Sequence, residues 1–215
     1  NTLILPEHLK LELNFEWMDE RVWGVTQYDL LIKGHDVEEI VLDESLSNIY
    51  ILDAHWALYC ENYLEGFHVP YIHKGLNKDI DFDTYKTILL ENGVLQFTEN
   101  KSSDKNNIMG SNIYAYYYWI YPNIMLNFYS WGLSMNIIEP LSINKTKITF
   151  LSFPIEGFRQ SENAPSSLDV IEKEDQEIVK SVQKGILSNS YKRGRYSPKH
   201  ELGVHHFHRL ISKSL

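Results

Sequence analysis

The chain has 215 residues, a length that suits one domain with a sizeable core. Its formal net charge is −9 and no block rich in lysine and arginine occurs, which argues against nucleic acid and membrane surfaces as partners. Because Cys60 is the one cysteine, no internal disulfide can form, and a reducing cytoplasm is the expected compartment. The uncharged run 106–138 is long enough to span a membrane, but its asparagines, proline and glycine favour buried strands.

The first half of the chain predicts a strand, a helix and then a series of strands. Residues 47–53 (SNIYILD) have the composition of a strand. Residues 54–67 predict a helix, because apolar side chains recur there at spacings of three and four, and Pro70 is expected to end or bend it. From about residue 85 to residue 153, turn signals separate what we expect to be antiparallel strands.

A second long helix is predicted over residues 167–187, where an apolar stripe follows a serine that can cap the first turn. Asp175 interrupts that stripe, and an acid on a buried helix face is costly unless a partner neutralises it. Glu172 and Gln176 fall on other faces and are expected to be solvated. Helices combined with a multi-stranded antiparallel sheet predict an α+β fold, with this long C-terminal helix packed across the sheet.

Two histidines follow the first helix, in the segment ENYLEGFHVPYIH (61–73). His68 and His73 are five residues apart, so on one helix their rings would point about 140° apart. Pro70 breaks the helix, and a turn can then bring His73 back beside His68. With Asp175 the histidines form a donor set typical of non-haem Fe(II). Zinc accepts the same ligands, and such histidine pairs are also common as structural features, so these residues alone leave three interpretations open.

The whole segment 61–73 resembles the iron-binding signature of Rieske-type ring-hydroxylating oxygenase large (alpha) subunits, which has an asparagine, an aromatic residue, an acid and two histidines around a proline. Further segments, in the expected order, resemble the choline monooxygenase branch of that family. They are DFDTYKT (81–87), YPNIMLNFY (121–129), EKEDQEIVKSVQKG (172–185) and YKRGRYSPKHELGVHHFH (191–208). The resemblance extends from about residue 47 to the C-terminus and implies a helix-grip fold like that of START domains and the Bet v 1-like plant allergens.

The resemblance also implies roles for individual residues. The implied ligands of one Fe(II) are His68, His73 and Asp175. Glu174 replaces Asp175 if the match is displaced by one residue. Glu65 matches an acid that bridges to a cluster-ligating histidine of a neighbouring subunit, and Asn62 matches an asparagine near the iron.

Enzymes of this family carry a [2Fe–2S] cluster on two cysteines and two histidines. With Cys60 alone this chain cannot hold one, so we expect residues 1–215 to be a single catalytic domain whose N-terminal Rieske domain is absent. The implied partners are dioxygen, a small organic substrate, and a reductase or ferredoxin that delivers electrons. We expect a homotrimer at full length, and no turnover by this domain alone.

The implied reaction is dioxygen activation at Fe(II), with hydroxylation or demethylation of an aromatic or quaternary ammonium compound. The tyrosine-rich stretch 114–119 could supply an aromatic cage for a quaternary ammonium group, although alternating aromatic residues also suit a half-buried strand. One alternative is a non-enzymatic helix-grip domain that binds a hydrophobic small molecule. Another is a zinc hydrolase, disfavoured by the histidine spacing. The histidines of 205–208 are expected to be structural.

Overall fold

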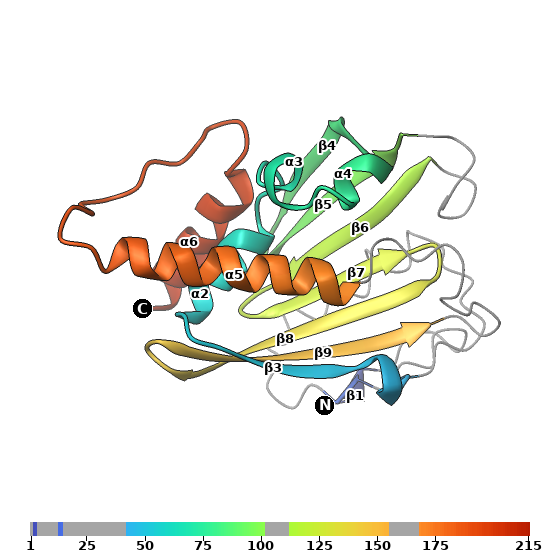
Figure 1. Ribbon diagram of the computed structural model, residues 1–215, viewed down its shortest axis with the longest axis horizontal. Helices are drawn as coiled ribbons and strands as arrows, with labels where there is room; N and C mark the ends of the chain where they lie inside the picture. The colour runs from blue at the N-terminus through green and yellow to red at the C-terminus, as the bar shows by residue number, and fades with distance from the viewer. Residues whose placement is uncertain (1, 4–12, 15–41, 102–111, 155–167) are drawn as a thin grey trace.

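The computed structural model describes residues 2–3, 13–14, 42–101, 112–154 and 168–215. Its main feature is an antiparallel sheet of seven strands in the order β3-β9-β8-β7-β6-β5-β4 (Figure 1). The strands are β3 (Asn48–Leu52), β4 (Ile80–Leu90), β5 (Gly93–Asn100), β6 (Ile113–Ile120), β7 (Ile124–Tyr129), β8 (Gly132–Ser142) and β9 (Lys145–Pro154). Two short strands, β1 (Thr2–Leu3) and β2 (Leu13–Asn14), pair separately.

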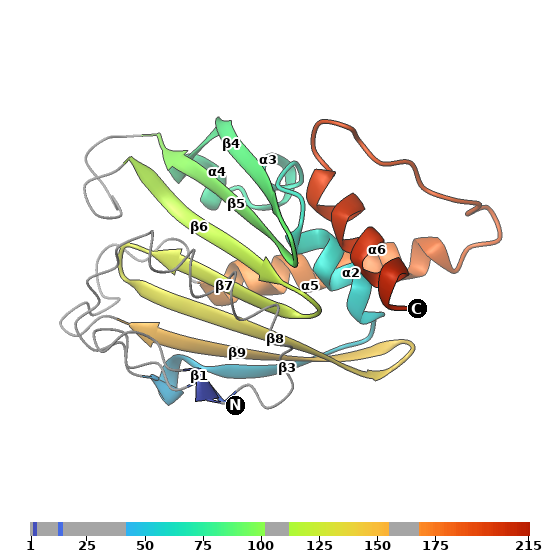
Figure 2. The ribbon, with the colours of Figure 1, turned by 180° about the vertical axis from the view of Figure 1, so that it is seen from behind.

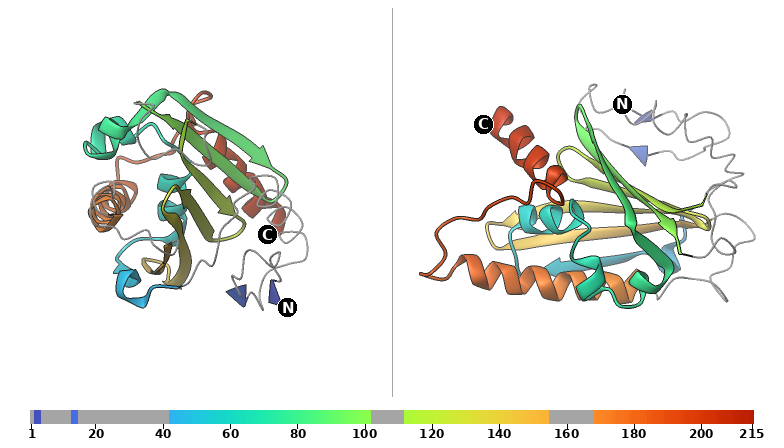
Figure 3. Two further views of the ribbon diagram at one scale, coloured as in Figure 1. Left: turned by 90° about the vertical axis from the view of Figure 1, so that its right-hand side faces the viewer. Right: turned by 90° about the horizontal axis from the view of Figure 1, so that it is seen from above.

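The helices are η1 (Glu44–Leu46), α2 (Trp56–Tyr63), α3 (Val69–Ile72), α4 (Leu76–Asp79), α5 (Leu168–Ile186) and α6 (Leu202–Ser214). Helix α5 crosses one face of the sheet, and Figure 2 shows the sheet from the other side, in front of α5. Figure 3 shows α5 end-on, in a layer of its own beside the strands. In the described part of the chain, no helix is long and apolar enough to cross a membrane.

These elements confirm the mixed fold with an antiparallel sheet and the strand expected over 47–53. Helix α5 matches the long helix expected over 167–187, although α6 follows it and is the last helix of the chain. The serines expected to cap α5 lie outside the described residues.

The buried side of α5 is mainly polar, which corrects one expectation. Glu172, Gln176 and Gln183 are buried along with Val179, so the prediction that Glu172 and Gln176 would be solvated is wrong. Periodicity identified the apolar residues of the helix but not the side that the sheet covers. That side faces polar groups of α2 and of the residue that precedes it, because the Tyr59 hydroxyl donates to Glu172 and the backbone N–H of His55 donates to Gln183.

The described residues form three buried apolar cores, and the two largest are built from residues that alternate along the strands, so they lie on opposite faces of the sheet. On β6 and β7, for example, Tyr118 and Leu126 belong to one core, whereas Trp119 and Met125 belong to the other. The second core also contains buried residues of the helices: Leu58, Tyr59, Cys60, Val179, Val204, Phe207 and Leu210. It therefore fixes α2, α5 and α6 against the sheet.

Helix α6 packs closely against the end of α2 because it carries a glycine at the contact. A Cβ atom on Gly203 would lie 2.5 Å from the carbonyl oxygen of Leu64, so no larger residue fits without a shift of the backbone. Phe207 is fully buried beside it and meets Trp119 edge-to-face. This contact fixes the point at which α2 ends.

A buried hydrogen-bond network ties α5 to α2 and the sheet. The Tyr59 hydroxyl donates to Glu172 Oε2 over 2.6 Å, and the Gln176 amide donates to Glu172 Oε1 over 2.9 Å. The amide of Asn136, on β8, donates to the Tyr59 hydroxyl over 3.2 Å. Burial raises the pKa of Glu172 to about 7, although these hydrogen bonds oppose the increase.

The raised pKa of Glu172 predicts a pH-dependent stability. The folded chain retains a proton that the unfolded chain releases, so this contribution is complete below about pH 4.5 and is lost as the pH rises through 7. Glu172→Gln keeps an acceptor for Tyr59 and has no carboxyl to ionise. Between pH 5 and pH 8, the free energy of unfolding should fall by up to about 3 kcal/mol less in this variant than in the wild-type chain.

Urea unfolding at both pH values, with a chelator present, measures this difference. The exposed Glu177, on the same helix, provides the matched control variant Glu177→Gln. Equal losses of stability in the wild-type chain and Glu172→Gln would contradict the prediction.

Candidate metal centre

The two histidines of the segment 61–73 lie at the two ends of one short helix. Helix α2 ends at Tyr63, four residues before the end of the helix expected over 54–67. Pro70 lies in the first turn of α3, where its missing N–H is not needed, so it helps to start a new helix after the old one has ended. His68 immediately precedes α3 and His73 immediately follows it. This break brings together two rings that a continuous helix would separate.

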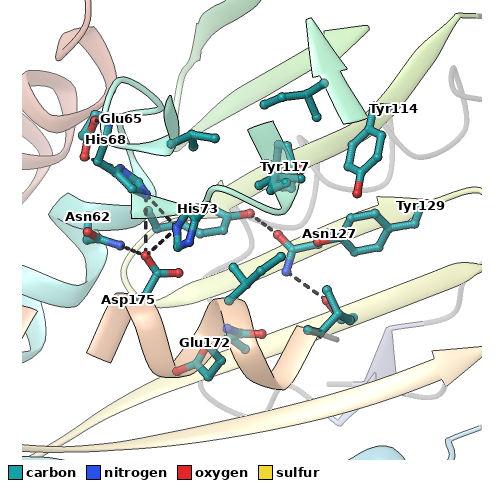
Figure 4. Close-up of a pocket in the computed structure, with 18 of the residues that line it drawn as sticks. Asn62, Glu65, His68, His73, Tyr114, Tyr117, Asn127, Tyr129, Glu172 and Asp175 are labelled. Atoms are coloured by element: carbon teal, nitrogen blue, oxygen red, sulfur yellow. Dashed lines mark hydrogen bonds and ion pairs between the residues drawn. The ribbon is translucent and has the colours of Figure 1, made fainter. Parts of the chain in front are cut away.

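The side chains of His68, His73 and Asp175 converge on one point (Figure 4). The two Nε2 atoms are 3.1 Å apart, and Asp175 Oδ1 lies 3.0 Å from His73 Nε2 and 3.5 Å from His68 Nε2. Ligands about 2.1 Å from one metal ion, at octahedral or tetrahedral angles, are separated by about 3.0 to 3.4 Å. Two of the three separations lie within this range and the third is slightly longer, so the three donor atoms form a group that could hold one metal ion.

Charge balance explains why an acid can occupy this buried position. Burial raises the pKa of Asp175, but hydrogen bonds to His68 and His73 outweigh that effect and lower it to about 2. Burial lowers the pKa of His68, but Asp175 and Glu65 outweigh that effect and raise it to about 9. In the metal-free chain, a proton on His68 thus balances the charge of the carboxylate. A bound metal cation would displace this proton and take over the neutralisation.

Two further carboxylates bond the outer nitrogens of the histidine rings. Glu65 Oε1 lies 2.5 Å from His68 Nδ1, and Glu174 Oε2 lies 2.8 Å from His73 Nδ1. The structure therefore brings Glu65 beside the three candidate ligands and places Glu174 next to His73.

The Asn62 amide donates to Asp175 Oδ1 over 2.6 Å. Asn62 comes from α2, which ends one residue later, whereas Asp175 lies in the middle of α5. This bond joins the two helices at the site, and it places Asn62 beside the candidate ligands as the sequence resemblance implied.

A cavity of about 110 Å³ opens beside the candidate ligands. Tyrosine rings form much of its wall, supplied by α2, β4, β6 and β7: Tyr63, Tyr85, Tyr114, Tyr117 and Tyr129. Tyr117 meets Tyr63 and Tyr129 edge-to-face, with ring centroids 6.5 and 6.1 Å away. Figure 4 shows Tyr117 near Tyr129, with Tyr114 also close by. Alternation along β6 places Tyr116 and Tyr118 on the face opposite Tyr117, where they pack in another core. A register shift between Ile113 and Ala115 accompanies the position of Tyr114 on the cavity side.

Some residues of this cavity were not identified from the sequence. Tyr59, Asn127 and Glu172 line it, and Asn127 accepts a hydrogen bond from the Tyr63 hydroxyl over 2.7 Å. Asn127 lies within the segment 121–129, but nothing in that segment shows which face of the strand meets the cavity.

The histidines near the C-terminus contact separate partners. His206 Nε2 lies 2.8 Å from the carbonyl oxygen of Leu90, and His208 Nε2 lies 2.8 Å from Glu61 Oε1. They attach α6 to its neighbours, in agreement with the structural role expected for residues 205–208.

Comparisons with known proteins show the family to which the chain belongs. The family described as the ring hydroxylating alpha subunit (catalytic domain) matches residues 33–215. The chloroplastic choline monooxygenase of Arabidopsis thaliana is 35% identical over 186 residues, which cover 81% of this chain and 43% of that protein. The carnitine monooxygenase oxygenase subunit of Escherichia coli (strain K12) is 29% identical over 74% of this chain and 46% of that protein. The chain thus spans less than half the length of these relatives.

Solved structures share the fold. A quaternary ammonium Rieske monooxygenase, CntA, superposes with a TM-score of 0.73 at 21% identity, over 90% of this chain and 56% of that one. Dicamba monooxygenase superposes with a TM-score of 0.54 at 16% identity, over 78% of this chain and 57% of that one. The family match, which covers most of the sequence, and the 35% identical plant relative show that the chain belongs to the ring-hydroxylating oxygenase alpha-subunit family, in the region of its catalytic domain.

Proposed function

We propose that this chain is the catalytic domain of a Rieske-type non-haem iron monooxygenase acting on a small quaternary ammonium compound. The observation that carries the proposal is the convergence of His68 Nε2, His73 Nε2 and Asp175 Oδ1 beside a tyrosine-lined cavity. Relatives named choline and carnitine monooxygenases support the substrate class. The position of α5 across an antiparallel sheet supports assignment to the helix-grip folds.

In this proposal His68, His73 and Asp175 hold one Fe(II) through three donor atoms on one side of the ion. Such a set leaves coordination positions open, and the iron supplies the activation of dioxygen. Glu65 orients His68 through its Nδ1 atom, and Asn62 fixes the Asp175 carboxylate by its hydrogen bond. The surrounding tyrosines limit the access of water to the ligands.

The electron supply is proposed to come from outside these residues. A Rieske cluster needs two cysteines, and the chain has only Cys60, so we place the [2Fe–2S] cluster on a separate N-terminal domain. Glu65 is the proposed entry point for electrons from the cluster of a neighbouring subunit in a homotrimer, with a reductase or ferredoxin upstream. The cytoplasmic location stays a prediction, because the plant relatives are described as chloroplastic.

The alternative of a non-enzymatic carrier for hydrophobic ligands gains no support. The relatives are oxygenases. The cavity places two histidines and an ionised aspartate at one end, which a carrier of apolar molecules does not need.

The assigned ligands predict the metal content of the chain. After anaerobic loading with Fe(II), elemental analysis should find about one iron per chain. Asp175→Asn and His68→Ala should each reduce this to below about a tenth, because each removes a donor from a three-ligand site.

The matched control is Asp169→Asn, which removes an acid from the first turn of the same helix, away from the histidines. Circular dichroism checks that each variant is folded. A wild-type chain without stoichiometric metal, or an Asp169→Asn variant that loses iron to the same extent, would refute the assignment.

The tyrosine wall predicts selectivity for a cation. Choline should bind the metal-loaded chain more tightly than 3,3-dimethylbutanol, its uncharged analogue, as measured by calorimetry. Tyr117→Leu should weaken choline binding by about 3- to 30-fold, since a cation over an aromatic face gains about 0.5 to 2 kcal/mol. Tyr117→Phe, which keeps the ring, should retain most of the affinity.

Tyr116 precedes Tyr117 on β6 and packs on the opposite face of the sheet. Tyr116→Leu is therefore the control and should bind choline as the wild-type chain does. Equal affinities for choline and its uncharged analogue would argue against a cation-binding role for these rings.

A further inference from the structure

The two candidate histidine ligands each use both ring nitrogens, and the two nitrogens have different neighbours. The Nε2 atoms face each other and Asp175, at the point where the metal ion would lie. The Nδ1 atoms face outward, to Glu65 in one case and to Glu174 in the other. Each ring is therefore anchored by a carboxylate on the side away from the site.

Glu174 is next to Asp175 on α5, and the sequence alone left it as an alternative metal ligand. The structure separates the two acids. Asp175 Oδ1 lies 3.0 Å from His73 Nε2, whereas Glu174 Oε2 lies 2.8 Å from His73 Nδ1, on the other edge of the ring. A carboxylate bonded to Nδ1 points away from an ion bound at Nε2. Consecutive residues on a helix point about 100° apart, so α5 holds the His73 ring from two sides.

The Glu174–His73 contact and the Glu65–His68 contact differ in how far apart their residues lie in the sequence. Glu65 and His68 are three residues apart, so their contact is local. Glu174 and His73 are 101 residues apart, and their contact joins α5 to the end of α3. It therefore sets the position of the histidine relative to the helix that supplies the aspartate.

We propose that Glu174 is a positioning residue for the metal ligand His73. Its carboxylate accepts the Nδ1–H of the ring, which leaves the lone pair on Nε2 for the metal and fixes the plane of the imidazole. The inference rests on the proposed function, because it assumes that His73 binds a metal ion. The Glu174 side chain is 37% exposed, so replacing it opens no buried cavity.

Titration with Co(II), followed by its visible absorption, tests the proposal on the full chain. Glu174→Ala should weaken Co(II) binding by about 10- to 100-fold and alter the absorption bands, as expected when a ligand loses its outer hydrogen bond. Glu174→Gln retains an oxygen that can accept the Nδ1–H and should recover most of the affinity. Glu177→Ala, which removes an exposed acid three residues further along α5, is the control and should bind as the wild-type chain does.

A second readout reports the hydrogen bond itself. In the Zn(II)-loaded chain, NMR should show a slowly exchanging Nδ1 proton on His73 that disappears in Glu174→Ala and persists in Glu177→Ala. A loss of folding alone would not remove one ring proton selectively.

Several outcomes would overturn the inference. If the affinity of Glu174→Ala for Co(II) is within about twofold of that of the wild-type chain, Glu174 does not position His73, because losing an outer hydrogen bond should have a larger effect. The proposed function would still stand in that case. If Glu174→Ala abolishes binding while Asp175→Asn retains it, Glu174 is the ligand. If the wild-type chain binds no Co(II), the proposed function itself fails.

Discussion

The structure depends on one electrostatic constraint, the burial of an ionised aspartate within α5. Asp175 is tolerated there because two imidazoles and an asparagine amide meet its carboxylate, and the imidazoles outweigh the effect of burial and lower its pKa to about 2. To supply them, α2 must end early, α3 must separate His68 from His73, and α5 must lie across the sheet. The same contacts form the candidate metal site, where a bound cation would supply the neutralising charge.

Around this aspartate the interior is polar, although apolar cores lie close by. The buried carboxyl of Glu172 and the amides of Asn127 and Asn136 line the cavity together with the tyrosines. Buried polar groups of this kind cost stability unless they are bonded, and the bonds among Tyr59, Glu172 and Asn136 offset that cost. The cavity thus has polar and aromatic walls beside the candidate metal site, which suits a small cation more than an apolar chain.

The sequence predicted the strand at 47–53, the helix near 167–187 and the main residues of the site, because hydrophobic periodicity and a specific motif are local signals. It did not predict the burial of Glu172, since periodicity cannot show which side of a polar helix is covered. Helix α6 was also missed, although its buried Val204, Phe207 and Leu210 have helical spacing. The pairing of Glu174 with His73 joins residues 101 positions apart, so only the folded chain reveals it.

The measurement that tests the account most directly is a crystal structure of the Fe(II)-loaded chain with anomalous diffraction at the iron absorption edge. We expect one anomalous peak about 2.0 to 2.2 Å from Nε2 of His68 and of His73 and from a carboxylate oxygen of Asp175, with Glu174 on the outer nitrogen of His73. A peak bonded to Glu174, or no peak between the two histidines, would contradict it.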